Sequence, residues 1–380
     1  MPLRRRDLLP LASLALAGPW LDAAAAAESP PPAIRLAAGW RSEAAAGEAA
    51  DRVGIIEVDW AKEQVRLLAD LPAPGRVHGV VALPDGGFVA VATRPGHWLL
   101  RCDAEGRVVA RVITGQEFPG RTFNGHVTLS HDGQWLFTTE TSSPTGMSWV
   151  SVRDVRNLHR IHQFLSAGFD AHQCLLDDDG NVFIANGGIL RAEDGRKIDL
   201  DRMRPSLAHI DPDSTEVLGQ WRLQDQRLSI RHLAWSQQAD GKRVLGVGLQ
   251  AEHDDPSRRR EAPVLALWRG AELSMPSADA QAAGYVGDIA LGPMGGFILS
   301  GQKAARGLWW HPRAARTMTK VAELIEACAL ASLPLDGVPA VLIGSARGIA
   351  FWHPTRKPRM LAWPKPMLPD NHWALLARQA

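Results

Sequence analysis

An all-β fold, a seven-bladed β-propeller, is predicted for this chain of 380 residues by three observations. A short unit recurs in which a polar residue opens an apolar strand that ends in a turn, and its copies open at His78, His126, His172, His232, Asp288, Cys328 and His372. The copies are spaced by roughly 40 to 60 residues, a spacing typical of propeller blades. Strand-like alternation continues between the units, whereas helical periodicity is hard to find after residue 27.

Residues 1–27 have the pattern of an export signal. Three arginines, Arg4 to Arg6, precede an apolar stretch that ends at Leu21, and the alanines at 23–27 suit a signal peptidase. Arg5-Arg6-Asp7-Leu8-Leu9 resembles the twin-arginine motif, with an ordinary Sec leader as the alternative. We therefore expect a signal peptide over 1–27, a periplasmic protein with no transmembrane segment in its mature chain, and a single propeller domain over 28–380.

The first blade is expected to be completed by the end of the chain. Three strand-like runs, 34–40, 52–59 and 63–71, follow the leader without a fourth. The unit that opens at His372 would supply the missing inner strand over 372–377. Pairing this C-terminal strand with the N-terminal strands closes the ring and removes the free sheet edges that invite aggregation.

The second blade shows the plan that later blades repeat. Its inner strand is expected over 78–83, followed by strands over 88–93, 97–103 and 107–113. Asp-Gly and Glu-Gly turns join these strands, because glycine adopts positive φ without steric cost. Tryptophans recur in the third strands and are interpreted as core residues that pack between sheets.

The connections between second and third strands should emerge on the face where the inner strands begin. Two of them are long, residues 187–206 and residues 251–263. The first is expected to be an ordered lid, since long loops in compact domains are usually either functional or disordered. The second is highly charged and is expected to be a solvated flap.

The residues that open the units are predicted to meet at one mouth of the central channel. Imidazole and thiolate are good ligands for zinc, copper and iron, and ligands from separate strands need no local spacing motif. The predicted metal ligands are His78, His126, His172, His232, Cys328 and His372. Four more residues are expected at this mouth: Glu140 and Asn186, to complete or orient the ligand set, and Arg204 and Arg231, to hold an anion at the rim.

Structural roles are the alternative for these residues. In WD-type repeats a histidine that follows a glycine pins adjacent strands, but among the units found here a glycine precedes the histidine at His126 alone, and no Trp-Asp dipeptide ends a blade. The cysteines Cys102, Cys174 and Cys328 cannot all pair within one chain, so at least one is a free thiol or a ligand. A buried, inert thiol is the other interpretation.

Composition and absent motifs exclude several classes of protein. With 42 basic and 41 acidic residues, the net charge of +1 implies neither nucleic acid nor an anionic membrane as a partner. No Gly-x-Ser-x-Gly, P-loop or dinucleotide-binding fingerprint is present, so no nucleotide cofactor is expected. The lack of Cys-x-x-Cys-His argues against covalent haem. No catalytic residues are assigned, and a role other than catalysis is favoured.

A set of motifs runs along the chain: Phe123-Asn124-Gly125-His126, Ala185-Asn186-Gly187-Gly188-Ile189, residues 199–208, residues 228–234, Gly284-Tyr285-Val286-Gly287 and Asp370-Asn371-His372. Together they resemble a family of exported bacterial propeller proteins of unknown function, encoded beside imelysin-like iron-uptake proteins and a di-haem oxidoreductase. Two segments depart from the family pattern: residues 170–173 replace Gly-Pro-His-Glu, which removes a carboxylate at Gln173, and residues 327–329 replace Val-Cys-Gly. The resemblance implies periplasmic iron handling with those proteins as partners, and no established activity.

Three hypotheses follow. The leading one is a periplasmic propeller that binds a transition metal, iron or copper with zinc as a further candidate, in its histidine-lined mouth and serves iron acquisition. The second is an interaction module that docks an imelysin-like or haem partner while the histidines are structural. The third is a metal-dependent lactonase or oxidoreductase, which would need an open coordination position.

Overall fold

The computed structural model describes residues 29–43, 50–143, 145–192, 194–276 and 281–377. The signal peptide expected over 1–27 lies outside the described residues. The description below concerns the second compact unit of the chain, Pro31–Ala380. Over the described ranges, no helix has both the length and the apolar character needed to cross a membrane.

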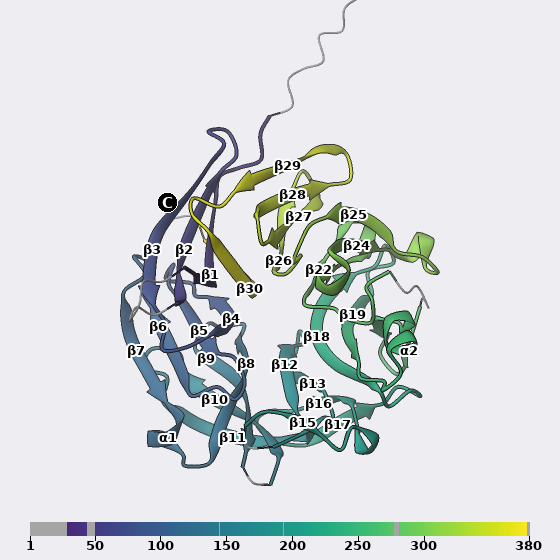
Figure 1. Cartoon of the computed structure of the whole chain (residues 1–380). Helices are drawn as coiled ribbons and strands as arrows, with labels where there is room; N and C mark the ends of the chain where they lie inside the picture. The colour runs from purple at the N-terminus through teal and green to yellow at the C-terminus, as the bar shows by residue number, and fades with distance from the viewer. Residues whose placement is uncertain (1–28, 44–49, 144, 193, 277–280, 378–380) are drawn as a thin grey trace, which may run out of the picture. The chain divides into compact units, whose positions relative to one another are not determined.

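The second unit is a ring of four-stranded antiparallel sheets, numbered here as blades 1 to 7 in chain order (Figure 1), which confirms the predicted seven-bladed propeller. From inner to outer strand, blade 1 consists of β30 (Met367–Leu376), β1 (Ile34–Ser42), β2 (Asp51–Asp59) and β3 (Gln64–Pro72), and blade 2 of β4 (Val77–Ala82), β5 (Phe88–Ala92), β6 (Trp98–Cys102) and β7 (Val108–Ile113). Blade 3 consists of β8 (Arg121–Leu129), β9 (Trp135–Ser142), β10 (Met147–Asp154) and β11 (Arg160–Phe169). Blade 4 consists of β12 (Ala171–Leu176), β13 (Val182–Asn186), β16 (Ser206–Ile210) and β17 (Val217–Trp221).

Blades 5 to 7 follow the same order from the inner strand outward. Blade 5 consists of β18 (Leu228–Gln237), β19 (Arg243–Ala251), β20 (Leu265–Trp268) and β21 (Leu273–Ser274). Blade 6 consists of β22 (Ile289–Leu291), β23 (Phe297–Gly301), β24 (Arg306–Trp310) and β25 (Thr319–Glu323). Blade 7 consists of β26 (Leu330–Leu335), β27 (Val338–Ser345), β28 (Gly348–His353) and β29 (Arg356–Ala362). The connections carry β14 (Leu190–Arg191), β15 (Lys197–Ile198), α1 (Thr114–Glu117), α2 (Pro256–Glu261) and the 3₁₀ turns η1 (Leu200–Arg202), η2 (Pro293–Gly295), η3 (Gln302–Ala304) and η4 (Pro312–Ala314).

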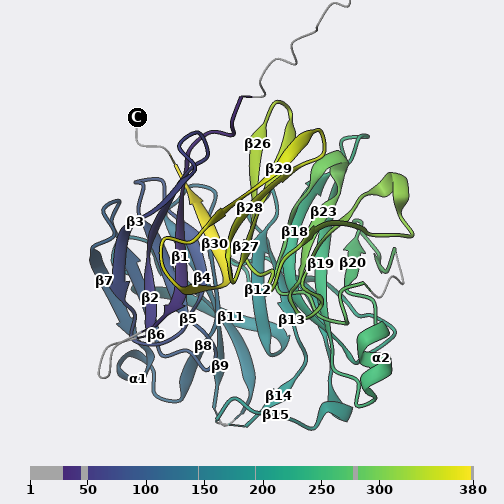
Figure 2. The ribbon, with the colours of Figure 1, turned by 45° about the horizontal axis from the view of Figure 1, so that its top comes forward.

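The ring closes as the sequence predicts. Strand β30 pairs antiparallel with β1, with Ala374 opposite Ala37, so the end of the chain supplies the inner strand of blade 1. The inner strands contact one another in turn around the axis, and β30 touches both β26 and β4 (Figure 2). The observed strand is longer than the predicted one, because it begins at Met367 rather than at His372.

Apolar side chains pack between neighbouring blades and hold the ring together. Trp60 of blade 1 lies 5.8 Å from Phe351 of blade 7, measured between ring centroids, within a cluster that spans both sheets. Trp268 of blade 5 packs against Phe183 of blade 4 at 4.6 Å. Large flat side chains suit such interfaces because they bury much apolar area while the sheets remain about 10 Å apart.

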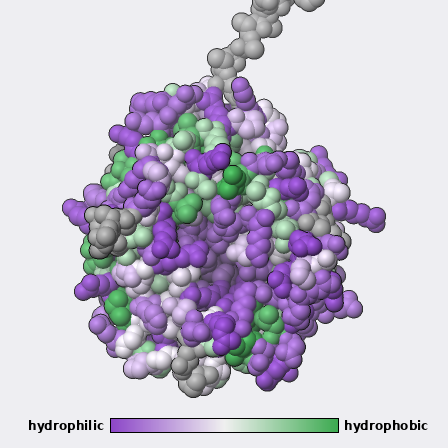
Figure 3. Space-filling model, in the orientation of Figure 1, coloured by the Kyte–Doolittle hydropathy of each residue, from purple (hydrophilic) through white to green (hydrophobic). Residues whose placement is uncertain are grey.

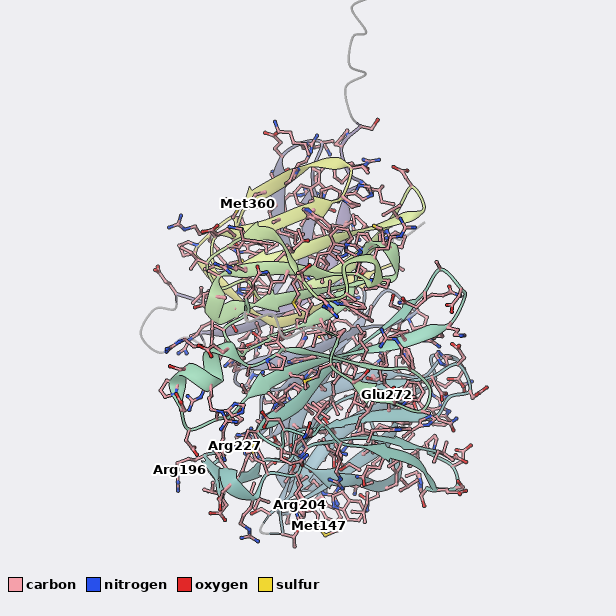
Figure 4. The ribbon with its side chains drawn as sticks, turned by 90° about the vertical axis from the view of Figure 1, so that its right-hand side faces the viewer. Met147, Arg196, Arg204, Arg227, Glu272 and Met360 are labelled. Carbon is pink, nitrogen blue, oxygen red and sulfur yellow. The ribbon has the colours of Figure 1, made fainter. Side chains whose placement is uncertain are left out.

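The long connection in blade 4 forms a small ordered lid, defined as residues 187–205. Strands β14 and β15 pair within it, and backbone bonds from Gly187 to Asp170 and from Gly188 to Phe169, each 2.9 Å, fasten its start. Gly188 has φ +73°, and a Cβ there would lie 2.2 Å from the nitrogen of Pro205, so only glycine fits. Arg196 and Arg204, both exposed, lie on the lid near the edge of the molecule seen in Figure 4.

Candidate metal centre

Each of the five channel histidines lies where its inner strand departs from regular pairing. Register shifts occur at His78 in β4, at His126 in β8, at His172 in β12 and directly before His232 in β18. In β30 the shift falls between Pro369 and Trp373, the segment that contains His372. A bulge bends its strand and re-aims a side chain that would otherwise alternate between the two faces of the sheet. Irregular pairing thus releases these imidazoles towards the axis.

The five imidazoles converge into one cluster at the channel, which we call the histidine cluster: His78, His126, His172, His232 and His372. The ring centroid of His126 lies 4.3 Å from that of His172 and 4.7 Å from that of His372. Two groups of three offer ligand atoms within 4.8 Å of one another, and both groups contain His126. All five residues are at most 9% exposed. At the centre of the ring the molecular surface shows a hydrophilic hollow (Figure 3).

Two carboxylates orient two of the imidazoles. Nδ1 of His78 lies 3.0 Å from Oδ1 of Asp370, and Nδ1 of His372 lies 3.2 Å from Oδ1 of Asp288. Backbone N–H groups fix both carboxylates, since Asn371 donates to Asp370 and both Ile289 and Leu330 donate to Asp288. A carboxylate that accepts from Nδ1–H leaves the lone pair of Nε2 free, which is the usual arrangement behind a metal-binding histidine.

Burial disfavours the charged form of three histidines of the cluster, His78, His126 and His232. It lowers the pKa of His78 to about 4, against the favourable effect of Asp370. Burial also lowers the pKa values of His126 and His232 well below the ordinary value, and the neighbouring imidazoles add to this effect. A neutral imidazole is the form that binds metal, so these histidines need not lose a proton at pH 7 before they bind an ion.

Several nitrogens of the cluster lack a hydrogen-bond partner within the described part of the chain. They are Nδ1 of His172, both ring nitrogens of His232 and Nε2 of His372. A buried polar atom without a partner costs about 1–3 kcal/mol, so a group of such atoms in one place is a candidate site for an ion or another ligand. The Nε2 atoms of His126 and His172 lie 3.1 Å apart. Two nitrogens bound tetrahedrally at 2.0–2.1 Å are about 3.3 Å apart, so this spacing suits ligands of one ion.

Other residues of the predicted site lie elsewhere. Cys328 is buried in the apolar cluster between blades 7 and 1, where burial raises the pKa of its thiol to about 12. In the described residues, the groups able to share one ion consist of histidines alone. Glu140 is buried between Arg121 and Arg153 in a separate ion-pair network. Asn186 donates to the carbonyl of Ser166 at 2.9 Å.

The two predicted anion-binding arginines differ in position. Arg204 is exposed on the lid, whereas Arg231 is 2% exposed and donates to Oδ2 of Asp170 at 2.9 Å. The guanidinium groups of Arg94 and Arg191 bind the other carboxylate oxygen of the same aspartate. Burial of the Asp170 carboxyl opposes its ionisation, but these arginines outweigh burial and hold its pKa far below the ordinary range.

Sequence reasoning missed Asp170, Asp370 and Arg94. A signal for the aspartates was present, because Asp170-Ala171-His172 and Asp370-Asn371-His372 repeat an Asp-x-His pattern at the same place in two blades. Arg94 follows a second strand, where no repeated pattern marks it.

Of two cavities in the described residues, one lies on the face opposite the histidine cluster and the other reaches a carboxylate that contacts it. A groove of about 1390 Å³ runs over hairpin turns such as Gln237–Arg243, which end the inner strands on the face opposite the histidines, so it is not part of the cluster. A smaller cavity of about 390 Å³ includes Arg76, Cys328 and Asp370 in its lining. Because Asp370 also holds His78, this cavity reaches the carboxylate behind the histidine cluster.

The sequence of the chain matches the model of one protein family. Its model, described as "Protein of unknown function (DUF1513)", matches residues 71–376. The chain belongs to this family. This member of the family is a seven-bladed propeller with histidines at the inner strands. A search of curated protein sequences finds no match to the chain.

Solved structures similar to this family member include other propellers. A chain of hydrazine synthase from Kuenenia stuttgartiensis is 11% identical, with a TM-score of 0.54 over 83% of this chain and 92% of that one. A streptogramin B lyase is 9% identical, with a TM-score of 0.53 over 78% of this chain and 86% of that one. At these identities the likeness shows the fold alone.

Proposed function

We propose that the chain is a periplasmic propeller that binds a transition-metal ion, iron or copper with zinc as a further candidate, in the histidine cluster and that it serves iron acquisition. The observation that carries the metal site is the set of buried imidazole nitrogens without partners among the described residues, on histidines that come from separate blades. A purely structural histidine would use both ring nitrogens to bind neighbouring groups. His232 offers neither nitrogen to any described residue, although it is 1% exposed.

The chemistry of the ligand set supports the same proposal. Imidazole suits iron, copper and zinc, whereas magnesium and calcium prefer oxygen ligands. His126 and His172 would hold the ion because their Nε2 atoms already lie 3.1 Å apart, and His126 is shared by both groups of three. Asp288 and Asp370 would fix the orientation of His372 and His78 from behind.

The role in iron acquisition is supported by the family resemblance, and export by the arginine-rich leader over 1–27. These features make an imelysin-like protein and a di-haem oxidoreductase the proposed partners. Both are associations, so they rank below the metal site, which is supported by distances and burial.

Elemental analysis by mass spectrometry tests the metal site. Untagged mature protein, exported in its native host and purified without chelator, is compared with the double variant His126→Ala/His232→Ala and with His162→Ala, which removes an exposed histidine from β11. We expect near-stoichiometric metal in the wild type and in His162→Ala, and its loss from the double variant with unchanged circular dichroism.

Metal-free wild-type protein that also refuses added iron, copper and zinc would contradict the metal site. Partner capture separates this outcome from the interaction hypothesis. Binding of an imelysin-like or haem partner that survives the double substitution would assign the channel histidines a structural role and leave the propeller as a docking surface.

A further inference from the structure

Several arginine side chains lie beside the histidine cluster, and three of them pair with the same carboxylate. Asp170 binds three arginines from three parts of the ring, namely Arg94 after β5, Arg191 on the lid and Arg231 in β18. Lys197, also on the lid, pairs with Glu252. These contacts tie the lid to the channel mouth.

The charges around Asp170 do not cancel. Arg94, Arg191 and Arg231 share this one carboxylate, and their side chains are 14%, 21% and 2% exposed. A divalent ion in the histidine cluster would add positive charge beside this group, in a place where burial makes uncompensated charge costly.

Arg94 faces the metal-binding atoms directly. Its Nη2 lies 3.4 Å from Nε2 of His172, while its Nη1 donates to Asp170. A guanidinium has no lone pair and cannot bind a metal, so an ion held by His172 would meet the N–H groups of a second cation. An anion placed between the two would accept from Arg94 and bind the ion at once.

Arg231 has spare donors in the same region. Arg231 is almost fully buried. Among the described residues, Asp170 accepts a hydrogen bond from its Nη1, and its Nε has no hydrogen-bond partner. A guanidinium carries five N–H donors, and a buried donor without an acceptor is unfavourable. Arg231 therefore has unused donors for an oxygen ligand beside Asp170, the carboxylate that it shares with Arg94.

We propose that Arg94, supported by Arg231, binds a small anion with two or more oxygen atoms that also coordinates the metal in the histidine cluster. The proposal rests on the metal site proposed above and names what completes it. The anion is a carboxylate or an inorganic oxyanion, and it arrives either as part of a metal chelate or free from solution. It bridges the guanidinium and the ion, and it offsets the positive charge that the ion adds.

Metal titrations with and without anions test the inference. Metal-free protein is titrated with zinc chloride against a chromogenic chelator, in a perchlorate buffer alone or with acetate, citrate, bicarbonate or phosphate. Arg94→Gln removes the charge, Arg94→Lys keeps the charge without the planar fork, and Arg107→Gln removes an exposed positive charge far from the channel as a control. Circular dichroism confirms that each variant is folded.

The expected result is that one of the anions tightens zinc binding to the wild type and to Arg107→Gln by about tenfold or more, the effect of one charge-assisted hydrogen bond. This gain is lost in Arg94→Gln and reduced in Arg94→Lys. Preference for citrate indicates a chelate as the source, and preference for bicarbonate or phosphate indicates a free oxyanion. Zinc binding that ignores all anions, or an anion effect that persists in Arg94→Gln, would overturn the inference while the metal site stands.

Failure of the metal site can be distinguished from failure of the anion site. If zinc, iron and copper all fail to bind under every condition, the metal site fails, and calorimetry of citrate and bicarbonate with the metal-free protein decides the anion site alone. Anion binding that depends on Arg94 keeps that site. No anion binding by the wild type removes it as well.

Discussion

Replacing Asp170 by asparagine should destabilise the ring strongly although the change is nearly isosteric. The carboxylate is buried at the start of blade 4 and accepts from Arg94 of blade 2, Arg191 of the lid and Arg231 of blade 5. An amide oxygen is uncharged and the amide nitrogen is a donor, so the neighbouring cations lose their shared counter-charge. Removing one partner of a buried ion pair typically costs about 3–5 kcal/mol.

The sign of the pH effect sets the conditions of the assay. Because the arginines hold the folded-state pKa of Asp170 below its unfolded value, the stability that this carboxylate contributes is present above the unfolded pKa and is lost on acidification. Urea unfolding at pH 7, followed by tryptophan fluorescence, therefore measures the full effect. Asp240→Asn, in an exposed turn, is the matched control and should change stability by less than about 0.5 kcal/mol.

Anions provide a second readout on the same variant. Asp170→Asn leaves one more unbalanced positive charge, so an oxyanion should bind the variant more tightly than the wild type. At one hundred times its dissociation constant for the variant, it should stabilise the variant by about 2.7 kcal/mol. An Asp170→Asn protein within about 1 kcal/mol of the wild type would refute the reasoning that these arginines depend on one carboxylate.

Further outcomes follow from the same contacts. Metal-free protein should lose stability as pH falls from about 6.5 to 4, because the unfolded chain binds a proton at His78 before the folded chain does. This residue alone should lower the free energy of unfolding by about 3 kcal/mol over that range. Urea unfolding at a series of pH values measures the loss. Asp370→Asn should weaken metal binding about 10- to 100-fold in a chelator competition, since His78 loses the carboxylate that orients it, and an unchanged affinity would argue against that role. Native protein should resist maleimide until it is unfolded, because burial raises the pKa values of Cys102, Cys174 and Cys328 to about 12, so rapid labelling of the folded state would contradict their burial. Cys328→Ala should keep its metal in elemental analysis, and metal loss from the folded variant would return this thiol to the ligand set.

The blades could be predicted from sequence because each one is a local pattern. Alternation with period two and glycine turns indicate the strands, and the repeated opening residue places the inner strand of each blade. Closure by the C-terminal strand was also predictable, since the first blade has three strand-like runs and the last unit has no blade of its own. These inferences need hydrophobic periodicity alone, which short stretches of sequence contain.

The histidine cluster was predictable in part for the same reason. Five histidines open inner strands, and a propeller brings the starts of its inner strands to one mouth. Cys328 opens a unit as well, yet it lies two residues before β26, in the apolar contact between blades 7 and 1. Glu140 and Asn186 end second strands, where other buried groups bind them. Position within a blade does not determine which way a side chain turns.

The sequence by itself determined the fold class, the number of blades, the way the ring closes and the five histidines of the cluster. The tertiary structure alone decided which of these residues meet. Asp370 orients His78, which lies 292 positions away in the sequence. Asp170 forms ion pairs with arginines from two other blades and from the lid. The physical reason is that strands follow local periodicity, whereas bulges and ion pairs between blades depend on the register and spacing of whole sheets.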